Sequence, residues 1–319
     1  MTGIKDIRIN IGRSVFKNPV FLASGPAGYG LEMINYIDMR RIGGVVTKTI
    51  SFEPRQGNPG VRLQETPSGL LNSIGLENVG AELFFKEKMA LLAAAGIKPV
   101  ISIAAEDWDD YRKLIDYIAE RDNVEIIELN LSCPNVERGG MTIGTDPALL
   151  SRYVRRAKEL LPDTDILAKL TPNVEDIGRL ALAAEEAGAD GITAINTIVG
   201  MDIDLSTSRP VFKRVRAGLS GPAIRPVALD AVWKISRTVD IPVIGAGGIS
   251  SVDDALKFFM AGASGVQIGT AIFYDPDLPE RIIERLETGG IPSPIEELID
   301  KTERNMDEGK AGDNSGTGC

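Results

Sequence analysis

The most informative absence in this sequence of 319 residues is histidine, which does not occur at all. Catalytic triads of the Ser-His-Asp type, zinc sites with imidazole ligands and iron sites with a facial triad all require it. The chain alone can build none of them. If the protein is an enzyme, a group other than imidazole must move its protons.

Cysteine, aromatic residues and long apolar runs are also scarce. Two cysteines, Cys133 and Cys319, are too few for a disulfide framework or a CxxC metal or iron–sulfur site. An aromatic content of 5% and a formal net charge of −10 argue against nucleic acid and anionic membrane surfaces as partners. No run reaches the roughly 18 apolar residues of a membrane-spanning helix, and the first residues lack a signal peptide's apolar core. We therefore expect a cytoplasmic globular protein without a bound metal.

Eight short apolar segments alternate with amphipathic patterns of helical spacing. Strands are expected at 20–25, 44–48, 99–104, 126–133, 166–170, 191–196, 242–247 and 265–269. Helices are expected at 31–40, where the pattern is weakest, and at 81–95, 108–121, 147–161, 174–187, 225–238, 252–261 and 278–288. Strands that are apolar on both faces and alternate with helices are typical of an α/β protein with a (β/α)8 TIM barrel. We expect one such domain over residues 1–309 and a disordered tail over 310–319.

Insertions are expected after the second, fourth and sixth strands. The connections 49–80 and 197–222 are long for a compact barrel, and the loop 134–146 after the fourth strand is rich in glycine. Connections of this length are usually lids or binding loops. Because barrel strands end at the face that carries the active site, we expect these insertions to border it.

Glycine-containing turns follow the seventh and eighth strands, as GAGGIS at 245–250 and QIGTA at 267–271. Backbone N–H groups of such turns can bind a phosphate without a cationic side chain. The G-x-G-x-x-G spacing of a dinucleotide site is absent, and tight packing would also explain glycine here. Their occurrence on two consecutive late strands favours a cofactor that carries phosphate.

Two lysines, Lys48 and Lys169, belong to segments that are otherwise apolar. Each could extend its charge to solvent from a strand end, but a lysine in such a segment is costly unless it meets negative charge. Two lysines facing one barrel mouth suit a flavin, whose reduced ring carries negative charge at N1 and O2.

Amide side chains and one thiol complete the predicted site. The asparagines Asn72, Asn130, Asn135 and Asn196 could each cap a turn, but together they suit a planar heterocycle with alternating C=O and N–H edges. Cys133 follows the fourth strand and opens a glycine-rich loop. Although a buried inert cysteine is the usual alternative, this thiol is the best proton acceptor that the chain offers at the barrel mouth.

These motifs together resemble the dihydroorotate dehydrogenase family, and within it the catalytic subunits of the NAD-linked type 1B enzymes. The segments that carry the resemblance are NPVFLASGPAGYG (18–30), ETPSGLLNSIGLEN (65–78), ELNLSCPNVERGGMTIGTDP (128–147), KLTPNV (169–174), INT (195–197), GLSGPAIRP (218–226), IPVIGAGGISSVDDAL (241–256) and GASGVQIGTA (262–271). Cysteine rather than serine at the position of the base is unlike the quinone-linked type 2 enzymes.

The resemblance implies FMN across the barrel mouth and a substrate beside it. The positions that match the family's cofactor site are Ala23, Ser24, Lys48, Thr49, Ser102, Asn130, Lys169, Ile195, Gly221, Gly247, Gly248, Gly269 and Thr270. Those that match its substrate site are Lys48, Asn72, Ser73, Ile74, Gly75, Leu76, Asn130, Asn135, Asn196 and Thr197. Cys133 matches the catalytic base, and Lys169 matches the lysine that stabilises the reduced flavin. Ser102 stands where the family usually carries asparagine.

The resemblance also implies partners. Hydride would leave C6 of (S)-dihydroorotate for FMN while Cys133 takes the C5 proton, giving orotate for pyrimidine biosynthesis. Electrons would pass to a second subunit with FAD and a 2Fe-2S cluster and then to NAD+. The expected assembly is a heterotetramer of two subunits of each kind, built on a homodimer of this chain.

Two other functions remain open at this point. A related FMN oxidoreductase could act on another cyclic amide, such as a dihydropyrimidine. Alternatively, the barrel could be a flavin-binding scaffold without catalysis, although the presence of Cys133, Lys48 and Lys169 argues against it.

Overall fold

Eight parallel strands form a closed barrel in the computed structural model, which describes residues 5–121, 123–131 and 143–295. Their order around the barrel is β10-β15-β16-β3-β4-β7-β8-β9. The strands are β3 (Val20–Leu22), β4 (Gly44–Val46), β7 (Pro99–Ile103), β8 (Ile126–Asn130), β9 (Asp165–Leu170), β10 (Gly191–Ala194), β15 (Val243–Ala246) and β16 (Gly265–Ile268). Each lies within or overlaps a predicted strand, so the (β/α)8 barrel is confirmed.

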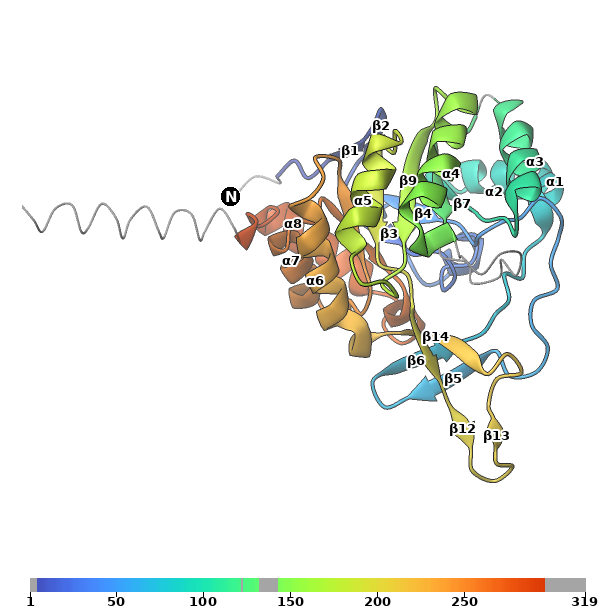
Figure 1. The fold of residues 1–319 in the computed structure, drawn as a ribbon. Coiled ribbons are helices and arrows are strands. Elements are labelled where there is room, and N and C mark those ends of the chain that lie inside the picture. Colours follow the sequence, from blue (N-terminus) through green and yellow to red (C-terminus); the bar gives the residue numbers. More distant parts are fainter. Residues whose placement is uncertain (1–4, 122, 132–142, 296–319) are drawn as a thin grey trace, which may run out of the picture.

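Helices surround this barrel (Figure 1). They are α1 (Gly80–Leu83), which continues through a π-helical turn at Phe84–Lys88 into α2 (Met89–Ala94), then α3 (Trp108–Ala119), α4 (Pro147–Leu160), α5 (Ile177–Glu186), α6 (Arg225–Ser236), α7 (Val252–Met260) and α8 (Leu278–Gly289). Side chains at the residue before the helix accept hydrogen bonds from its first free N–H groups: Asp107 for α3, Asp146 for α4, Asp176 for α5 and Ser251 for α7. The sequence therefore marks where these helices begin.

The helix expected at 31–40 is wrong. This segment forms only a short 3₁₀ turn at Leu31–Met33, entered from Gly30 with a φ of 93°. Its buried side chains, Ile37 and Met39, are two residues apart, whereas a helix buries residues three or four apart. The segment does bury apolar side chains, but their spacing suits an irregular chain that packs on the barrel.

A hairpin closes the amino-terminal end of the barrel. It consists of β1 (Ile9–Ile11) and β2 (Ser14–Phe16), and its side chains Ile9, Ile11 and Phe16 join residues of the barrel interior in one buried cluster. The buried carboxylate of Asp165 accepts hydrogen bonds from the backbone N–H groups of Arg13 at 3.1 Å and Ser14 at 2.7 Å. One side chain of β9 therefore anchors the turn of the hairpin.

We expect Asp165→Ala to lower the free energy of unfolding by about 3 kcal/mol, because two backbone donors lose their acceptor at about 1–3 kcal/mol each. Urea denaturation would measure the change. Asp163→Ala is the matched control, since Asp163 pairs with the side chain of Arg13 at the surface, where ion pairs contribute little. An equal loss of stability in both variants would contradict the anchoring role of Asp165.

The two described insertions pair with each other beside the carboxyl end of the barrel. Strands β5 (Leu63–Thr66) and β6 (Gly69–Asn72) follow β4, and β11 (Ile198–Met201), β12 (Ile203–Asp204), β13 (Arg209–Pro210) and β14 (Arg216–Ser220) follow β10. Four of them form a sheet in the order β11-β14-β6-β5, and β12 pairs with β13. Figure 1 shows these strands together on one side of the barrel, with the β12–β13 hairpin extending away from it. The pairing brings residues of two distant loops to one edge of the site.

Within residues 5–121, 123–131 and 143–295, no helix is both long and apolar enough to cross a membrane. The same ranges contain no group of three or more acidic or cysteine side chains that could hold a metal ion.

Candidate active site

Two adjoining cavities lie at the carboxyl ends of the barrel strands. The larger cavity has a volume of about 520 Å³ and the smaller cavity about 380 Å³. Both are lined by Lys48, Asn72, Lys169 and Asn196, so they form one continuous site. This is the end of the barrel at which such folds carry their active sites.

Three glycines from two separate backbone segments line the larger cavity, and we call them the glycine cradle: Gly221, Gly247 and Gly248. All three have positive φ, at 89°, 126° and 77°. A Cβ atom on Gly248 would lie 2.7 Å from the backbone nitrogen of Arg225, the first residue of α6, and 2.8 Å from the Gly221 carbonyl oxygen. The close approach of these backbone segments at the start of a helix is the geometry that binds phosphate through N–H groups.

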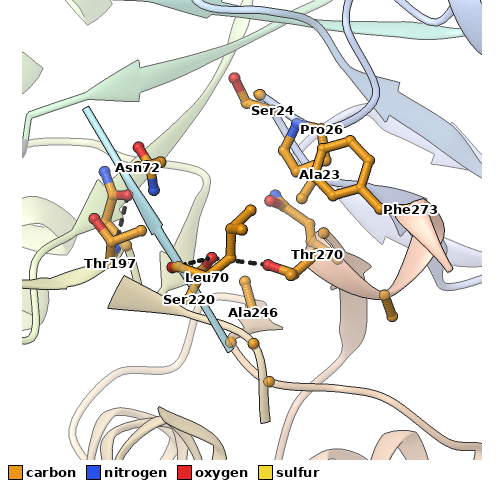
Figure 2. Close-up of a pocket in the computed structure, with 18 of the residues that line it drawn as sticks. Ala23, Ser24, Pro26, Leu70, Asn72, Thr197, Ser220, Ala246, Thr270 and Phe273 are labelled. Carbon is orange, nitrogen blue, oxygen red and sulfur yellow. Dashed lines mark hydrogen bonds between the residues drawn. The ribbon is translucent and has the colours of Figure 1, made fainter. Parts of the chain in front are cut away.

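Hydroxyl groups border the glycine cradle. Thr270 and Ser220 share a hydrogen bond of 2.9 Å between their hydroxyls, and Ser220 donates to the Leu70 carbonyl at 3.2 Å. Figure 2 shows these three residues together at the larger cavity, with Asn72 and Thr197 to one side and Ser24 and Pro26 to the other. Strand β6 of the first insertion therefore supplies part of the wall.

Asparagine side chains gather at the smaller cavity. Asn196 donates from Nδ2 to Oδ1 of Asn130 at 3.1 Å, and Asn72 donates to the Gly218 carbonyl at 3.0 Å. Gly218 lies on β14, so this bond joins the two insertions. Each amide retains further hydrogen-bonding capacity for a bound molecule.

The loop after β6 is held in place by Asn58. Its Nδ2 donates to the carbonyl and hydroxyl oxygens of Ser73 at 3.1 and 3.0 Å. Gly75 packs so closely on the same side chain that a Cβ would lie 2.4 Å from Asn58 Oδ1. The loop 73–76 thus lines the smaller cavity as a fixed backbone segment.

Lys48 follows β4 and forms an ion pair with Glu77 at 3.4 Å. Arg62 pairs with the same carboxylate at 3.0 Å. The hydrogen bond from Arg62, followed by the charge of Lys48, lowers the pKa of Glu77 below its usual value. Glu77 is therefore ionised at neutral pH and keeps the ammonium of Lys48 at the cavity wall.

Lys169 lies inside β9 and is only 6% exposed. Its Nζ is 3.4 Å from Oε1 of Glu128 on β8, a residue with no exposed surface. The other carboxylate oxygen accepts hydrogen bonds from Thr193 Oγ1 at 2.9 Å and Gln267 Nε2 at 2.8 Å. The lysine that the sequence places in an apolar strand thus has a buried counter-charge.

The structure places most of the predicted site residues at these cavities. The predicted substrate residues that line the smaller cavity are Lys48, Asn72, Ser73, Ile74, Gly75, Leu76, Asn130, Asn196 and Thr197. The predicted cofactor residues that line one or both cavities are Ala23, Ser24, Lys48, Thr49, Asn130, Lys169, Ile195, Gly221, Gly247, Gly248, Gly269 and Thr270. Cys133 and Asn135 lie outside the described residues.

Ser102 is the exception. It lines neither cavity and is completely buried, and its hydroxyl shares a hydrogen bond of 2.8 Å with the hydroxyl of Thr49. Thr49 in turn lines the smaller cavity and accepts from Asn130 Nδ2 at 3.4 Å. The short serine side chain thus supports a cavity residue rather than forming the wall.

Three polar residues at or beside the cavities are not among the residues predicted from the sequence: Glu128, Gln267 and Glu77. The first two are polar residues inside mainly apolar strands, which is the signal that singled out Lys169. Because a buried charge requires a partner, the presence of Lys169 in an apolar strand predicts a nearby buried carboxylate, and Glu128 is that residue. Glu77 lies in a loop, where a carboxylate is common, and only the fold shows that it pairs with Lys48.

The barrel, its polar rim and the glycine cradle are features of (β/α)8-barrel enzymes, which frequently have a phosphate-binding site at the carboxyl ends of their strands. A family model described as dihydroorotate dehydrogenase matches residues 7–289 of the chain.

Several relatives have the name dihydroorotate dehydrogenase B (NAD(+)), catalytic subunit. The protein from Pelobacter propionicus is 44% identical over 282 residues, 88% of this chain and 92% of the relative. The one from Trichlorobacter lovleyi is 45% identical over 279 residues, 88% and 91% of the two chains. The one from a Thermoanaerobacter species is 43% identical over 296 residues, 92% and 96%. The chain belongs to the dihydroorotate dehydrogenase family.

A solved structure shows the same fold. The crystal structure of DHODH from Eimeria tenella in complex with ferulenol matches with a TM-score of 0.72 and 23% identity, covering 88% of this chain and 83% of that one. At this identity the match supports the architecture alone.

Proposed function

We propose that this protein is the catalytic subunit of an NAD-linked dihydroorotate dehydrogenase, which oxidises (S)-dihydroorotate to orotate in pyrimidine biosynthesis. The observation that carries the proposal is one continuous site in which a glycine cradle suited to phosphate adjoins amides and lysines suited to a planar acidic ring. The names of the relatives support the same substrate.

The residues of the larger cavity fit FMN. Gly247 and Gly248 open the backbone to a phosphate, and the positive charge of Lys169 suits the ring. Gln267 lines the same cavity, and its buried Oε1 accepts no hydrogen bond from the described residues. A buried acceptor requires a donor, such as an N–H group of a heterocycle. When bound, FMN supplies the acceptor for the hydride.

The smaller cavity would bind the substrate. Asn72, Asn130 and Asn196 can each donate and accept, which matches the alternating C=O and N–H groups of the dihydroorotate ring. Lys48 supplies a positive charge for the substrate carboxylate and is already held at the wall by Glu77. These side chains would fix the ring in one orientation.

Cys133 is the proposed base. Its thiolate would take the proton from C5 as the hydride leaves C6, so that the substrate loses two electrons and two hydrogens and gains the C5–C6 double bond. This role comes from the resemblance and from the absence of histidine in the chain.

A second subunit would carry the electrons onward. The relatives are named as catalytic subunits of an NAD(+) enzyme, which supports a separate partner that reduces NAD+. We propose that this partner holds FAD and a 2Fe-2S cluster and that two copies of each subunit form a heterotetramer on a homodimer of this chain.

Anaerobic titration with dihydroorotate tests the function. The purified chain should be yellow, its flavin absorbance should bleach as dihydroorotate is added, and it should fail to reduce NAD+ without the partner. A yellow protein that is silent to dihydroorotate but bleached by a dihydropyrimidine would favour the related oxidoreductase. A protein that binds no flavin would contradict both functions.

A further inference from the structure

Glu128 is a completely buried carboxylate with no assigned role in the proposed function. It lines neither cavity, yet it lies 3.4 Å from Lys169, which lines both. Thr193 and Gln267 hold its second oxygen, so side chains from β9, β10 and β16 surround one carboxylate on β8. A buried carboxylate is costly, and this one is kept by donors from three strands.

The pair Glu128–Lys169 lies beside the larger cavity, because Lys169 lines it. A cation beside a flavin stabilises the reduced, negatively charged ring, because the attraction is strong where water is excluded. A carboxylate a few ångströms behind that cation cancels part of its field. The first oxygen of Glu128 accepts no hydrogen bond from the described residues, and its contact with Lys169 is an ion pair.

We propose that Glu128 is a positioning residue that orients Lys169 and offsets its charge, and thereby holds the reduction potential of bound FMN lower than Lys169 alone would set it. The proposal rests on the proposed function. A catalytic subunit must release electrons to a partner after each turnover, and a cofactor held at lower potential releases them more readily.

The test is the potential of the holoprotein, measured by equilibration with a reference dye during stepwise reduction by dithionite. Glu128→Gln keeps the size of the side chain and removes its charge. We expect the equilibrium to shift at least tenfold toward reduced FMN, which is about 30 mV for a two-electron couple. Glu128→Asp retains the charge, so its reduction potential should be closer to that of the unmodified protein than the potential of Glu128→Gln.

Glu125→Gln is the matched control. Glu125 directly precedes β8, is exposed and pairs with Lys98 at 2.8 Å. Removing its charge should leave the potential unchanged. A shift equal to that of Glu128→Gln would show that the effect comes from net charge rather than from the buried pair, and would overturn the proposal.

A double substitution keeps the proposal testable if Glu128→Gln does not fold. Lys169→Gln should lower the potential, and adding Glu128→Gln removes the pair as a neutral unit, so the double variant should return toward the unmodified value. A double variant with the same reduction potential as Lys169→Gln alone would overturn the role of Glu128. Failure of dihydroorotate to bleach the unmodified protein would instead contradict the proposed function, so the two failures are distinguishable.

Discussion

Cys133→Ala is expected to retain FMN and to oxidise dihydroorotate about 10²–10⁴-fold more slowly, which is the usual contribution of a positioned general base. The chain contains no histidine that could take over the proton. The cavity residues proposed to hold FMN and the substrate are unchanged in this variant, so the loss should fall on the rate rather than on cofactor content. The rate of flavin bleaching after anaerobic mixing with dihydroorotate measures this step directly.

Cys319→Ala is the matched control, because it removes the only other thiol of the chain. The flavin of this variant should bleach at the same rate as that of the unmodified protein. The bleaching rate of Cys133→Ser should lie between those of the unmodified protein and Cys133→Ala, since a hydroxyl can accept a proton but is a weaker base than a thiolate at neutral pH. Undiminished bleaching in Cys133→Ala would remove the thiol from the mechanism.

The barrel could be predicted because its strands are buried on both faces. Segments such as β3 and β15 are short, apolar and bounded by polar or glycine-containing turns, which distinguishes them from the amphipathic helices. The segment 31–40 contains apolar residues among polar ones, as the helices do, but it forms only a short 3₁₀ turn. Its irregular conformation depends on contacts with the rest of the fold. The sheet formed by β6 and β14 could not be predicted either, since its strands belong to insertions more than a hundred residues apart.

The candidate site could be predicted where a residue type is unusual for its position. Glycine pairs at strand ends and lysine in an apolar strand are signals of this kind, and the structure brings Gly248 and Lys169 to the same cavity. The side chains that pair with these residues could not be predicted from the sequence. The pairing of Glu77 with Lys48 and the position of Ser102 behind Thr49 depend on which side chains meet across the fold.

Gly248→Ala should abolish most FMN binding. The residue has a φ of 77°, which costs an L-amino acid of order 1–3 kcal/mol, and the added Cβ would lie 2.7 Å from the Arg225 nitrogen and 2.8 Å from the Gly221 carbonyl. Both neighbours are backbone and cannot move aside without opening the glycine cradle. We expect an affinity for FMN at least 10–100-fold weaker, measured by fluorescence titration of the apoprotein.

The control for Gly248→Ala must share its backbone strain but not its position. Gly60 has a φ of 82°, and a Cβ there would meet nothing within 4 Å. Gly60 lines neither cavity, so Gly60→Ala should bind FMN normally even if it unfolds at a lower temperature. If Gly248→Ala binds FMN as tightly as Gly60→Ala, the phosphate does not lie on the glycine cradle, because no bound phosphate could tolerate displacement of the backbone donors that hold it.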